Sequence, residues 1–259
     1  MTKSATREAA DEVSAPIASP VFTGNVGVGV TPEASYPDRP VVRVGSGLGL
    51  QCRATGNPSH TWINSNSYQD ASTAADKYIG TDQASQIKQT NGAFTFNVAP
   101  SGTADAAISW TTAMTINNAG IVTKPLQPII SVSRNNSSLS FTTNQDVFAS
   151  TSMLNWVVQG ISHNTSNGRF TVPVAGKYYV HFFSMKNNDV SAYFNVLKNG
   201  SSMGLRIYDT ANATSWHSYG LGGVFTLAAN DYLNVVCGDG ASSNAHGLNH
   251  MNFTIHLIG

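Results

Sequence analysis

A single stretch, residues 168–180 (GRFTVPVAGKYYV), limits the fold of this chain more than any other. Apolar and polar residues alternate around Phe170, which is the period of a half-buried β-strand. Pro173 has no N–H to donate to a strand ladder, so it belongs at a strand end. Gly176 supplies the backbone freedom that a tight reversal needs, and the alternation resumes at Tyr178. The pattern predicts one strand, a tight turn and the start of a second strand.

Strand-like alternation returns in three later segments, residues 192–200, 222–236 and 251–259. The composition agrees with folded β structure, since 41% of the residues are hydrophobic, 11% are charged and the formal net charge is zero. Disordered chains usually combine low hydrophobicity with a high net charge. The sequence therefore predicts a compact antiparallel β domain in residues 129–259, with polar turns.

Charge and hydropathy exclude several classes of function. Nucleic-acid binding needs clustered Lys and Arg, and the sequence has no such cluster. No run reaches the roughly 18 apolar residues of a membrane span, so membrane insertion is not expected. Residues 1–16 lack the apolar core of a secretory signal, which indicates synthesis in a cytoplasm without general secretory export. Cys52 and Cys237 lie in different expected domains, and we predict buried or inert thiols without a bridge.

The first half of the chain has a different character. Residues 3–13 hold helix formers and end before Pro16, which is typical of a short docking helix or of a frayed tail. In residues 26–30 valine alternates with glycine, which predicts a strand with one apolar face and one bare face. Such a strand is an exposed edge unless another chain covers it, and identical copies around an axis would do so.

Residues 36–124 contain short apolar runs divided by polar turns, and few are long enough for a globular core. We expect thin β structure with little interior of its own, which favours intertwined or stacked chains. The segment 125–128 (PLQP) is a stiff connector. The expected organisation is a terminal segment 1–20, a β-rich shaft or connector domain 21–124, a linker 125–128 and a head 129–259.

Several short motifs follow one another in the first half: SPVFTGNVGVG at 19–29, NSY at 66–68 with ASQ at 84–86, QTNGAFTF at 89–96, APSGTA at 99–104, and the segment 114–120. In this order they resemble bacteriophage tail-fibre proteins. The resemblance implies a shaft that trimerises and carries a terminal head. It also implies that residues 1–20 are a virion-attachment segment held by a tail adaptor or tail-tube protein.

The signature G-x-F-x-x-P-x-x-G-x-Y is present as Gly168, Phe170, Pro173, Gly176 and Tyr178. Together with a hairpin turn at 197–200, a strand at 222–227 and a closing strand at 251–259, it makes residues 129–259 resemble the complement C1q/TNF-like jelly roll. The chain departs from that family at residues 230–231, where Asn-Asp replaces the usual Gly-Asp, and at residue 255, where Ile stands in place of a common Gly. The resemblance implies an all-β chain whose antiparallel jelly-roll head packs into a homotrimer about a threefold axis.

Enzymatic chemistry is not predicted, and no cofactor is expected. The sequence contains no Gly-rich phosphate loop, no Cys-x-x-Cys pair and no H-E-x-x-H helix. One G-x-S-x-G match at 200–204 falls in an expected hairpin loop, whereas a nucleophile elbow needs a strand-to-helix turn. Glycan hydrolysis needs two facing carboxylates. The head has no Glu, and a carboxylate pair across a trimer interface stays open for its aspartates, Asp146, Asp189, Asp209, Asp231 and Asp239.

Two polar loops of the head, residues 209–219 and 238–249, are the predicted binding sites. Exposed aromatic rings stack on sugars and anchor interfaces, while Asn and Asp bond to hydroxyl groups. The alternative for Trp216 is an inward position in the core or in a trimer contact. The candidate receptor-binding residues are Tyr208, Asp209, Asn212, Trp216, His217, Tyr219, Asn244 and His246.

Metal binding is a minor alternative, and no metal site is predicted. Asp239 lies in an oxygen-rich loop of the kind that holds Ca²⁺. On the last strand His250 and His256 share a polar face, and three copies around an axis would bring them together. Solvated or hydrogen-bonded histidines are the competing interpretation.

Together these patterns predict a virion protein made in the host cytoplasm: a homotrimeric phage tail fibre. Its N-terminus would attach to the tail, and its head would bind a host surface glycan or outer-membrane protein. One alternative is a structural connector or decoration whose head only trimerises the fibre. The other is a tail-spike enzyme that acts on surface polysaccharide.

Overall fold

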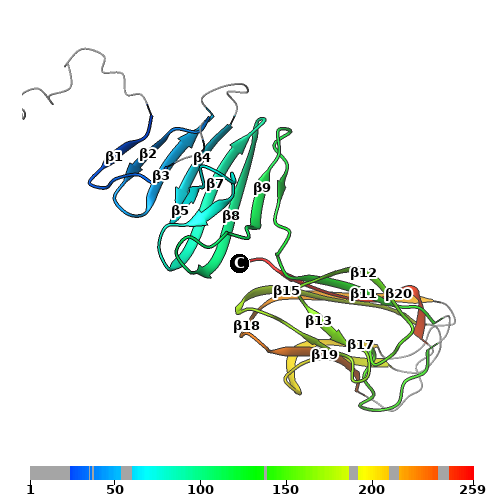
Figure 1. Cartoon of the computed structure of the whole chain (residues 1–259). Helices are drawn as coiled ribbons and strands as arrows, with labels where there is room; N and C mark the ends of the chain where they lie inside the picture. Colours follow the sequence, from blue (N-terminus) through cyan, green and yellow to red (C-terminus); the bar gives the residue numbers. More distant parts are fainter. Residues whose placement is uncertain are drawn as a thin grey trace, which may run out of the picture. The chain divides into compact units, whose positions relative to one another are not determined.

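The computed structural model describes residues 24–34, 36, 38–53, 60–136, 139–186, 192–209, 216–238 and 245–259, with only the backbone at residues 192, 209 and 245–249 (Figure 1). The chain divides into two compact units, Met1–Pro125 and Leu126–Gly259. Every regular element in the described ranges is a β-strand, which confirms the all-β class. No helix of these residues has the length and apolar character to span a bilayer. The expected attachment segment 1–20 lies outside the described residues.

The first unit is built on an eight-stranded sheet with the order β1-β2-β3-β4-β7-β8-β9-β10. β1 runs parallel to β2, and the other neighbours are antiparallel. A separate hairpin of β5 and β6 accompanies the sheet. The strands are β1 Val26–Val28, β2 Val41–Val44, β3 Leu48–Cys52, β4 His60–Ser65, β5 Ser67–Gln69, β6 Asp76–Tyr78, β7 Asp82–Thr90, β8 Ala93–Gly102, β9 Thr111–Ile116 and β10 Val122–Thr123.

This unit has a small apolar interior. Its only core cluster among the described residues consists of Tyr78, Ala84 and Ala99, with Ile108 and Trp110 packed against it. The valine-glycine strand is β1, and a Cβ at Gly27 would run into the Val30 carbonyl and Pro32. The prediction of thin β structure with little interior of its own therefore agrees with the first unit.

The head contains two sheets. One has the order β13-β14-β19-β16-β17, and the other has the order β18-β15-β20. The paired strands β11 and β12 lie beside β20, because Leu257 N–H donates to Pro128 O at 2.9 Å and the Ser131 and Thr254 hydroxyls are 2.9 Å apart. The strands are β11 Ile129–Arg134, β12 Met153–Gln159, β13 Ser162–Asn164, β14 Arg169–Thr171, β15 Gly176–Lys186, β16 Ala192–Lys198, β17 Ser201–Asp209, β18 His217–Leu227, β19 Tyr232–Cys237 and β20 Ala245–Leu257.

The chain crosses repeatedly between these two sheets. β14 belongs to one sheet, β15 to the other, β16 and β17 to the first, and β18, β19 and β20 alternate again. Two antiparallel sheets connected in this way form a jelly roll. The predicted fold class of the head is therefore confirmed.

The strand order corrects the interpretation of residues 168–180. β14 pairs with β13 and β19, whereas β15 pairs with β18 and β20. The segment after Pro173 is thus a crossover between sheets and not a tight reversal. Gly176 is required for a different reason, since a Cβ there would meet the Leu257 side chain and the Gly259 carbonyl.

The other signature residues stabilise this crossover. Gly168 has φ +67°, and a Cβ there would overlap the Asp146 carboxylate. That carboxylate accepts hydrogen bonds from Phe148 N–H at 3.0 Å and Asn234 Nδ2 at 2.7 Å, while its burial raises the pKa of Asp146. The Tyr178 hydroxyl donates to Val174 O at 2.8 Å. The signature therefore describes backbone and packing constraints.

The hairpin turn at 199–200 and the departure at 230–231 have a local explanation. The hairpin between β16 and β17 turns at Asn199 and Gly200, with φ of 50° and 81°, as the sequence predicts for this position. Asn230, which replaces the usual glycine, has φ 68° and so adopts the same left-handed region. Asp231 accepts hydrogen bonds from Asn199 Nδ2 at 2.7 Å and Ala228 N–H at 2.8 Å.

The interior of the head is large and aromatic. Phe148 lies 5.7 Å from both Phe170 and Phe253, and Phe170 lies 5.1 Å from Phe253, measured between ring centroids. Cys237 is buried in this core, but Cys52 of the first unit is exposed. The two cysteines form no disulfide with each other, as predicted, and only Cys237 is one of the expected buried thiols.

Candidate functional site

One line of side chains crosses most of the N-terminal sheet on a single face. Residues directly opposite each other in neighbouring strands point to the same side. Leu50 and Ile63, near the middle of the line, are 43% and 37% exposed. From β1 to β9 the register joins Val26, Val42, Leu50, Ile63, Ile87, Phe96 and Met114, which we call the apolar row.

The same face is apolar beyond this row and is hollowed. Other large exposed side chains on it are Val44, Leu48, Phe94 and Val98. Hollows of about 410 Å³ and 300 Å³ lie along it, the first against Val26, Val42 and Leu50 and the second against Leu48, Ile63 and Phe96. We call the apolar row and these flanking side chains the apolar face.

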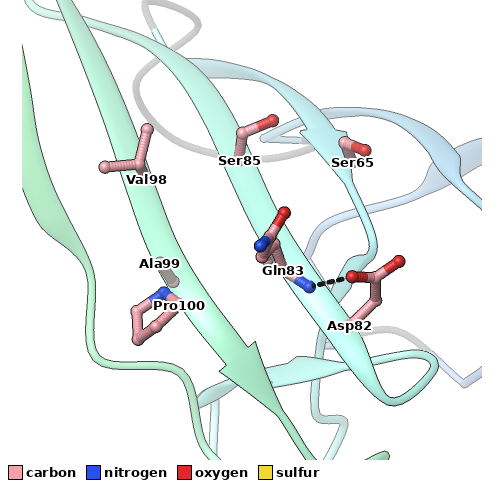
Figure 2. A pocket seen from close by; sticks show the side chains of 8 residues that line it. Ser65, Asp82, Gln83, Ser85, Val98, Ala99 and Pro100 are labelled. Atoms are coloured by element: carbon pink, nitrogen blue, oxygen red, sulfur yellow. Dashed lines mark hydrogen bonds between the residues drawn. The ribbon is translucent and has the colours of Figure 1, made fainter.

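Figure 2 shows a third hollow, of about 520 Å³, toward one end of strands β4, β7 and β8. Ser65, Ser85 and Val98 are paired across the three strands and line it. Gln83 N–H donates to Asp82 Oδ1 at 2.8 Å at its margin. The residues that line this hollow do not combine an acid, a base and a nucleophile as a catalytic site would. We interpret the hollow as an uneven part of the surface of the apolar face.

The opposite face of the sheet is polar and covered. Gln86, Asn64 and Asn97 are no more than 8% exposed. Gln86 Nε2 donates to Asn64 Oδ1 at 3.0 Å, Asn97 Nδ2 donates to Gln86 Oε1 at 3.2 Å, and the Thr112 hydroxyl donates to Asn97 Oδ1 at 3.1 Å. We call this hydrogen-bonded line, with Gln51 at its other end, the amide ladder. The first unit thus buries its polar face and exposes its apolar one.

In the head, the strands that flank the two predicted binding loops end together. Lys186 of β15 pairs with His217 of β18 and with Ala245 of β20. Ala192 of β16 pairs with Asp209, the last residue of β17. The loops predicted to bind therefore start and finish at one end of the jelly roll.

Two of the predicted contact residues are strongly exposed at this end. Tyr208 is 63% exposed and Trp216 is 47% exposed, so Trp216 does not belong to the core. Its placement in a trimer contact stays an open alternative. His217 is half-buried, and Tyr219 is half-buried and packs against the core of the head.

The remaining predicted site residues are described only in part. Asn212, Asn244 and the Ca²⁺ candidate Asp239 lie outside the described residues. Asp209 and His246 are described by their backbone alone. The structure leaves the assignment of these five side chains as a prediction.

Sequence reasoning missed two neighbours of Tyr208. The Tyr193 and Tyr208 rings meet edge to face at 6.1 Å, and the Arg206 guanidinium lies 5.9 Å from the Tyr193 ring centre. Tyr193 and Arg206 precede the loop 209–219, so a search confined to polar loops passed over them. Their alternation with buried Phe194 and Ile207 was the available signal.

Among the side chains that the structure describes, the histidines of β20 and the serine of the G-x-S-x-G match form no catalytic arrangement. Met251, Phe253 and Ile255 are fully buried, while His250 and His256 are half-buried on the other face of β20, as predicted. No group of three or more His, Cys, Asp or Glu in the described part of the chain is placed to hold a metal ion.

Ser202, the serine of the G-x-S-x-G match, lies in β17 directly after the hairpin turn. Its hydroxyl donates to Asn195 Oδ1 at 2.8 Å and accepts from Arg206 Nε at 3.1 Å. A serine nucleophile needs a base within hydrogen-bond reach, and these two partners do not supply one.

No family model matches the chain, and no curated protein sequence matches it. Among solved structures the chain is similar to the Eiger TNF of S. frugiperda (10% identity, TM-score 0.43), the globular domain of zebrafish complement 1qA (18%, 0.40) and murine APRIL (13%, 0.41). Each match covers 51% of this chain and 93%, 98% and 99% of the respective structure. The assignment of the head as a jelly roll depends on its own strand order.

Proposed function

We propose that the protein is a homotrimeric fibre protein of a phage tail, in which a shaft completed by three copies carries three adhesive heads. The observation that carries this proposal is the exposed apolar row. Large exposed apolar surfaces on soluble proteins usually mark an interface. Because the row crosses the sheet from β1 to β9, a partner must cover the sheet face as a whole.

Copies of the same chain are the partner that fits this face best. Two sheets pack face to face at about 10 Å, with side chains from both inner faces interdigitating. The row has no charged residue, so identical rows meet without like-charge repulsion. Three such faces around a threefold axis would form a closed assembly, and most soluble homo-oligomers have closed symmetry of this kind. The number three comes from the resemblance to tail fibres and C1q-like heads.

The heads supply the proposed contact with a host surface. Tyr208 and Trp216 present aromatic rings at the end of the jelly roll where the loops 209–219 and 238–249 start and finish. Such rings suit sugar faces or a protein surface. Three copies raise the effective concentration at that surface, so weak single contacts add up to firm adhesion. The tail adaptor or tail-tube partner of residues 1–20 and the virion location are proposed from the sequence resemblance.

The assembly is tested by the mass of the full chain in solution. We expect three times 27.4 kDa by light scattering. A stable single copy of 27.4 kDa would contradict the proposal, because the apolar face would then be exposed to water without aggregation.

The adhesive role is tested by the adsorption of the full chain to bacterial cells. We expect Tyr208→Ala with Trp216→Ala to lower adsorption at least tenfold through multivalency, with unchanged mass. Trp156→Ala is the matched control, because Trp156 is an equally exposed tryptophan on β12. An intact trimer that adsorbs to no host would favour a structural connector, and release of reducing ends from host polysaccharide would favour a tail-spike enzyme.

A further inference from the structure

The five-stranded sheet of the head carries a patch of aromatic and polar side chains on β16 and β17. Tyr193 pairs directly with Tyr208, and Asn195 pairs with Arg206. Residues opposite each other in neighbouring strands point to the same side of the sheet. Phe194, between Tyr193 and Asn195, belongs to the core, so the four side chains point away from the core. We call these four residues the tyrosine-arginine patch.

Arg206 is exposed, and one edge of its guanidinium group is held in place. Its Nε and Nη2 both donate to the Ser202 hydroxyl at 3.1 Å, while the group lies 5.9 Å from the Tyr193 ring centre. Among the residues that the structure describes, no ion pair includes Arg206. The edge formed by Nη1 and Nη2 is therefore open to a ligand, and such an edge binds both oxygens of a carboxylate or a phosphate group.

Asn195 gives a second, independent indication of a ligand. It is 8% exposed, and its Oδ1 accepts a hydrogen bond from the Ser202 hydroxyl at 2.8 Å. The described residues provide no partner for its Nδ2, and this nitrogen is not one of the fully enclosed polar atoms. A polar atom in such a position is normally satisfied by water or by a ligand. Because Arg206 and Asn195 bind the same hydroxyl, one small ligand can contact both.

The two tyrosines give the patch an aromatic side. Tyr208 is 63% exposed and meets the Tyr193 ring edge to face at 6.1 Å. The Tyr193 ring is fixed from below, since a Cβ at Gly238 would overlap it. Exposed aromatic rings stack on sugar faces, and phenol hydroxyls both donate and accept hydrogen bonds. A protein partner prefers aromatic anchors in well-packed, desolvated pockets, whereas these rings lie among amide, hydroxyl and guanidinium groups. The combination favours a sugar with an acidic group.

We propose that the tyrosine-arginine patch binds an anionic saccharide, with its carboxylate or phosphate group on the Nη1–Nη2 edge of Arg206 and its ring against Tyr208. Asn195 Nδ2 donates to a sugar hydroxyl. This inference rests on the proposed adhesion of the heads and names its ligand class, because the host surface glycan is then acidic. Arg206 is the residue that determines this specificity.

The test measures binding of the full chain to three neutral polymers that carry galacturonate, galactose 6-phosphate or galactose side groups, by surface plasmon resonance. These sugars share one ring and differ in the acidic group. We expect at least one anionic polymer to be bound about tenfold more tightly than the galactose polymer, as a hydrogen bond to a charged group allows. The tighter of the two anionic polymers identifies the group as carboxylate or phosphate.

A variant of the arginine separates its geometry from its charge. Arg206→Lys keeps the positive charge but removes the planar edge with two nitrogens. We expect it to lower the affinity for the preferred anionic polymer about tenfold, with galactose binding and the mass in solution unchanged. Arg169→Lys is the matched control, because Arg169 is also exposed, lies on β14 of the same sheet and stacks on Tyr232 at 4.1 Å. It should change neither affinity.

Four results would overturn the inference. Absence of binding to all three polymers would leave water as the occupant of the patch, and equal binding to all three would exclude recognition of the anion. An equal loss in Arg169→Lys would reduce the effect to general surface charge. Adsorption to host cells that is lost after protease treatment but kept after periodate oxidation of surface glycans would identify a protein partner.

The proposed function fails in a different way. A full chain with the mass of a single copy, or one that adsorbs to no host cell, contradicts the adhesive trimer whatever the polymers show. A chain that adsorbs to cells but shows no preference for an anionic polymer contradicts only the ligand class inferred here.

Discussion

The two units of this chain use the same strand alternation with opposite outcomes. In the head, the apolar sides of β14, β15 and β20 face inward, and Phe170, Tyr178 and Phe253 are fully buried, whereas β12 keeps an exposed apolar stretch at 156–158. In the first unit, the covered side of the sheet carries the amide ladder, while Leu50 and Ile63 remain exposed. One copy of the head therefore has a large core of its own, whereas the first unit has a small one and leaves the apolar side of its sheet uncovered.

The amide ladder explains why burying the polar face is tolerated. A buried amide without partners is costly, but one that exchanges hydrogen bonds with its neighbours is not. Asn64, Gln86 and Asn97 each lie opposite the next in register, so one amide satisfies another. The ladder therefore fixes the register of the sheet in place of an apolar core.

The largest effect is expected from a charge placed in the apolar row, which tests whether this row is the contact between copies. Ile63→Asp puts a carboxylate at the centre of the row, and the desolvation of an unpaired charge in an interface costs several kcal/mol. We expect the mass to fall from three times 27.4 kDa to 27.4 kDa, measured by light scattering. The exposed thiol of Cys52, on the same face, should then react with a thiol reagent, while Cys237 stays buried and unreactive.

The control for this prediction is Ala119→Asp, since Ala119 is exposed in the turn between β9 and β10. It adds the same charge to the same unit and should leave the mass unchanged. If Ile63→Asp also kept the wild-type mass, the apolar row would not be the contact between copies.

The second prediction concerns the head alone. Phe253→Ala removes a fully buried ring that lies 5.1 Å from Phe170 and 5.7 Å from Phe148. We expect the free energy of unfolding of the head to fall by about 3–5 kcal/mol, measured by thermal or denaturant unfolding. Phe94→Ala is the matched change in the first unit, because Phe94 is 41% exposed on the apolar face. Phe94→Ala should leave the melting temperature of the head unchanged. If both variants destabilised the head equally, the interiors of the two units would not be separate.

The third prediction tests the amide ladder. Gln86→Ala leaves Asn64 Oδ1 and Asn97 Nδ2 without their partner inside the sheet. We expect a loss of about 2 kcal/mol in the unfolding of the first unit, since each unsatisfied buried group costs on the order of 1–3 kcal/mol. Gln89→Ala, on the exposed face of the same strand, should cost less than about 0.5 kcal/mol. Equal losses would mean that the ladder carries no special stability.

These differences also show what the sequence can predict. Alternation and the Asn-Gly turn at 199–200 were enough to find parts of β14, β15, β16, β18, β19 and β20, because both are local signals, but they did not identify β11, β12, β13 or β17. The pairing of β14 and β15 was not predictable in this way, since a crossover between sheets and a hairpin can share the same residues. The reason for Gly176 lies in a contact with Leu257, far along the chain.

The candidate sites were harder to predict from the sequence for a different physical reason. Alternation shows that a strand has two unlike faces, but it does not show which one the fold covers. Gln51, Asn64, Gln86 and Asn97 look like solvent-facing residues, and the buried amide ladder appears only when five neighbouring strands are in register. Tyr208 and Trp216 beside the polar loops are exposed in one copy, which excludes the core for Trp216, and their role in binding stays a prediction.

The smallest expected effect is on the pH dependence of stability, which depends on different carboxylates in the two units. In the head, hydrogen bonds from Lys198 Nζ, Asn199 Nδ2 and Ala228 N–H hold the pKa of Asp231 at about 2. An aspartate in an unfolded chain has a pKa near 3.9. The stabilisation by Asp231 is therefore complete above about pH 4 and is lost as the pH falls toward 2.

Asp231→Asn should therefore lower the melting temperature of the head by about 5 °C at pH 7, for a loss of about 1 kcal/mol, and have little effect near pH 2. Asp146 acts in the opposite sense, because burial raises its pKa and protonation in acid favours the folded head. Asp70 is the control in the first unit, where Lys77 and the Ser72 and Thr73 hydroxyls lower the pKa of its carboxyl. Asp70→Asn should leave the melting of the head unchanged at every pH, and a shift there would show that the two units do not unfold independently.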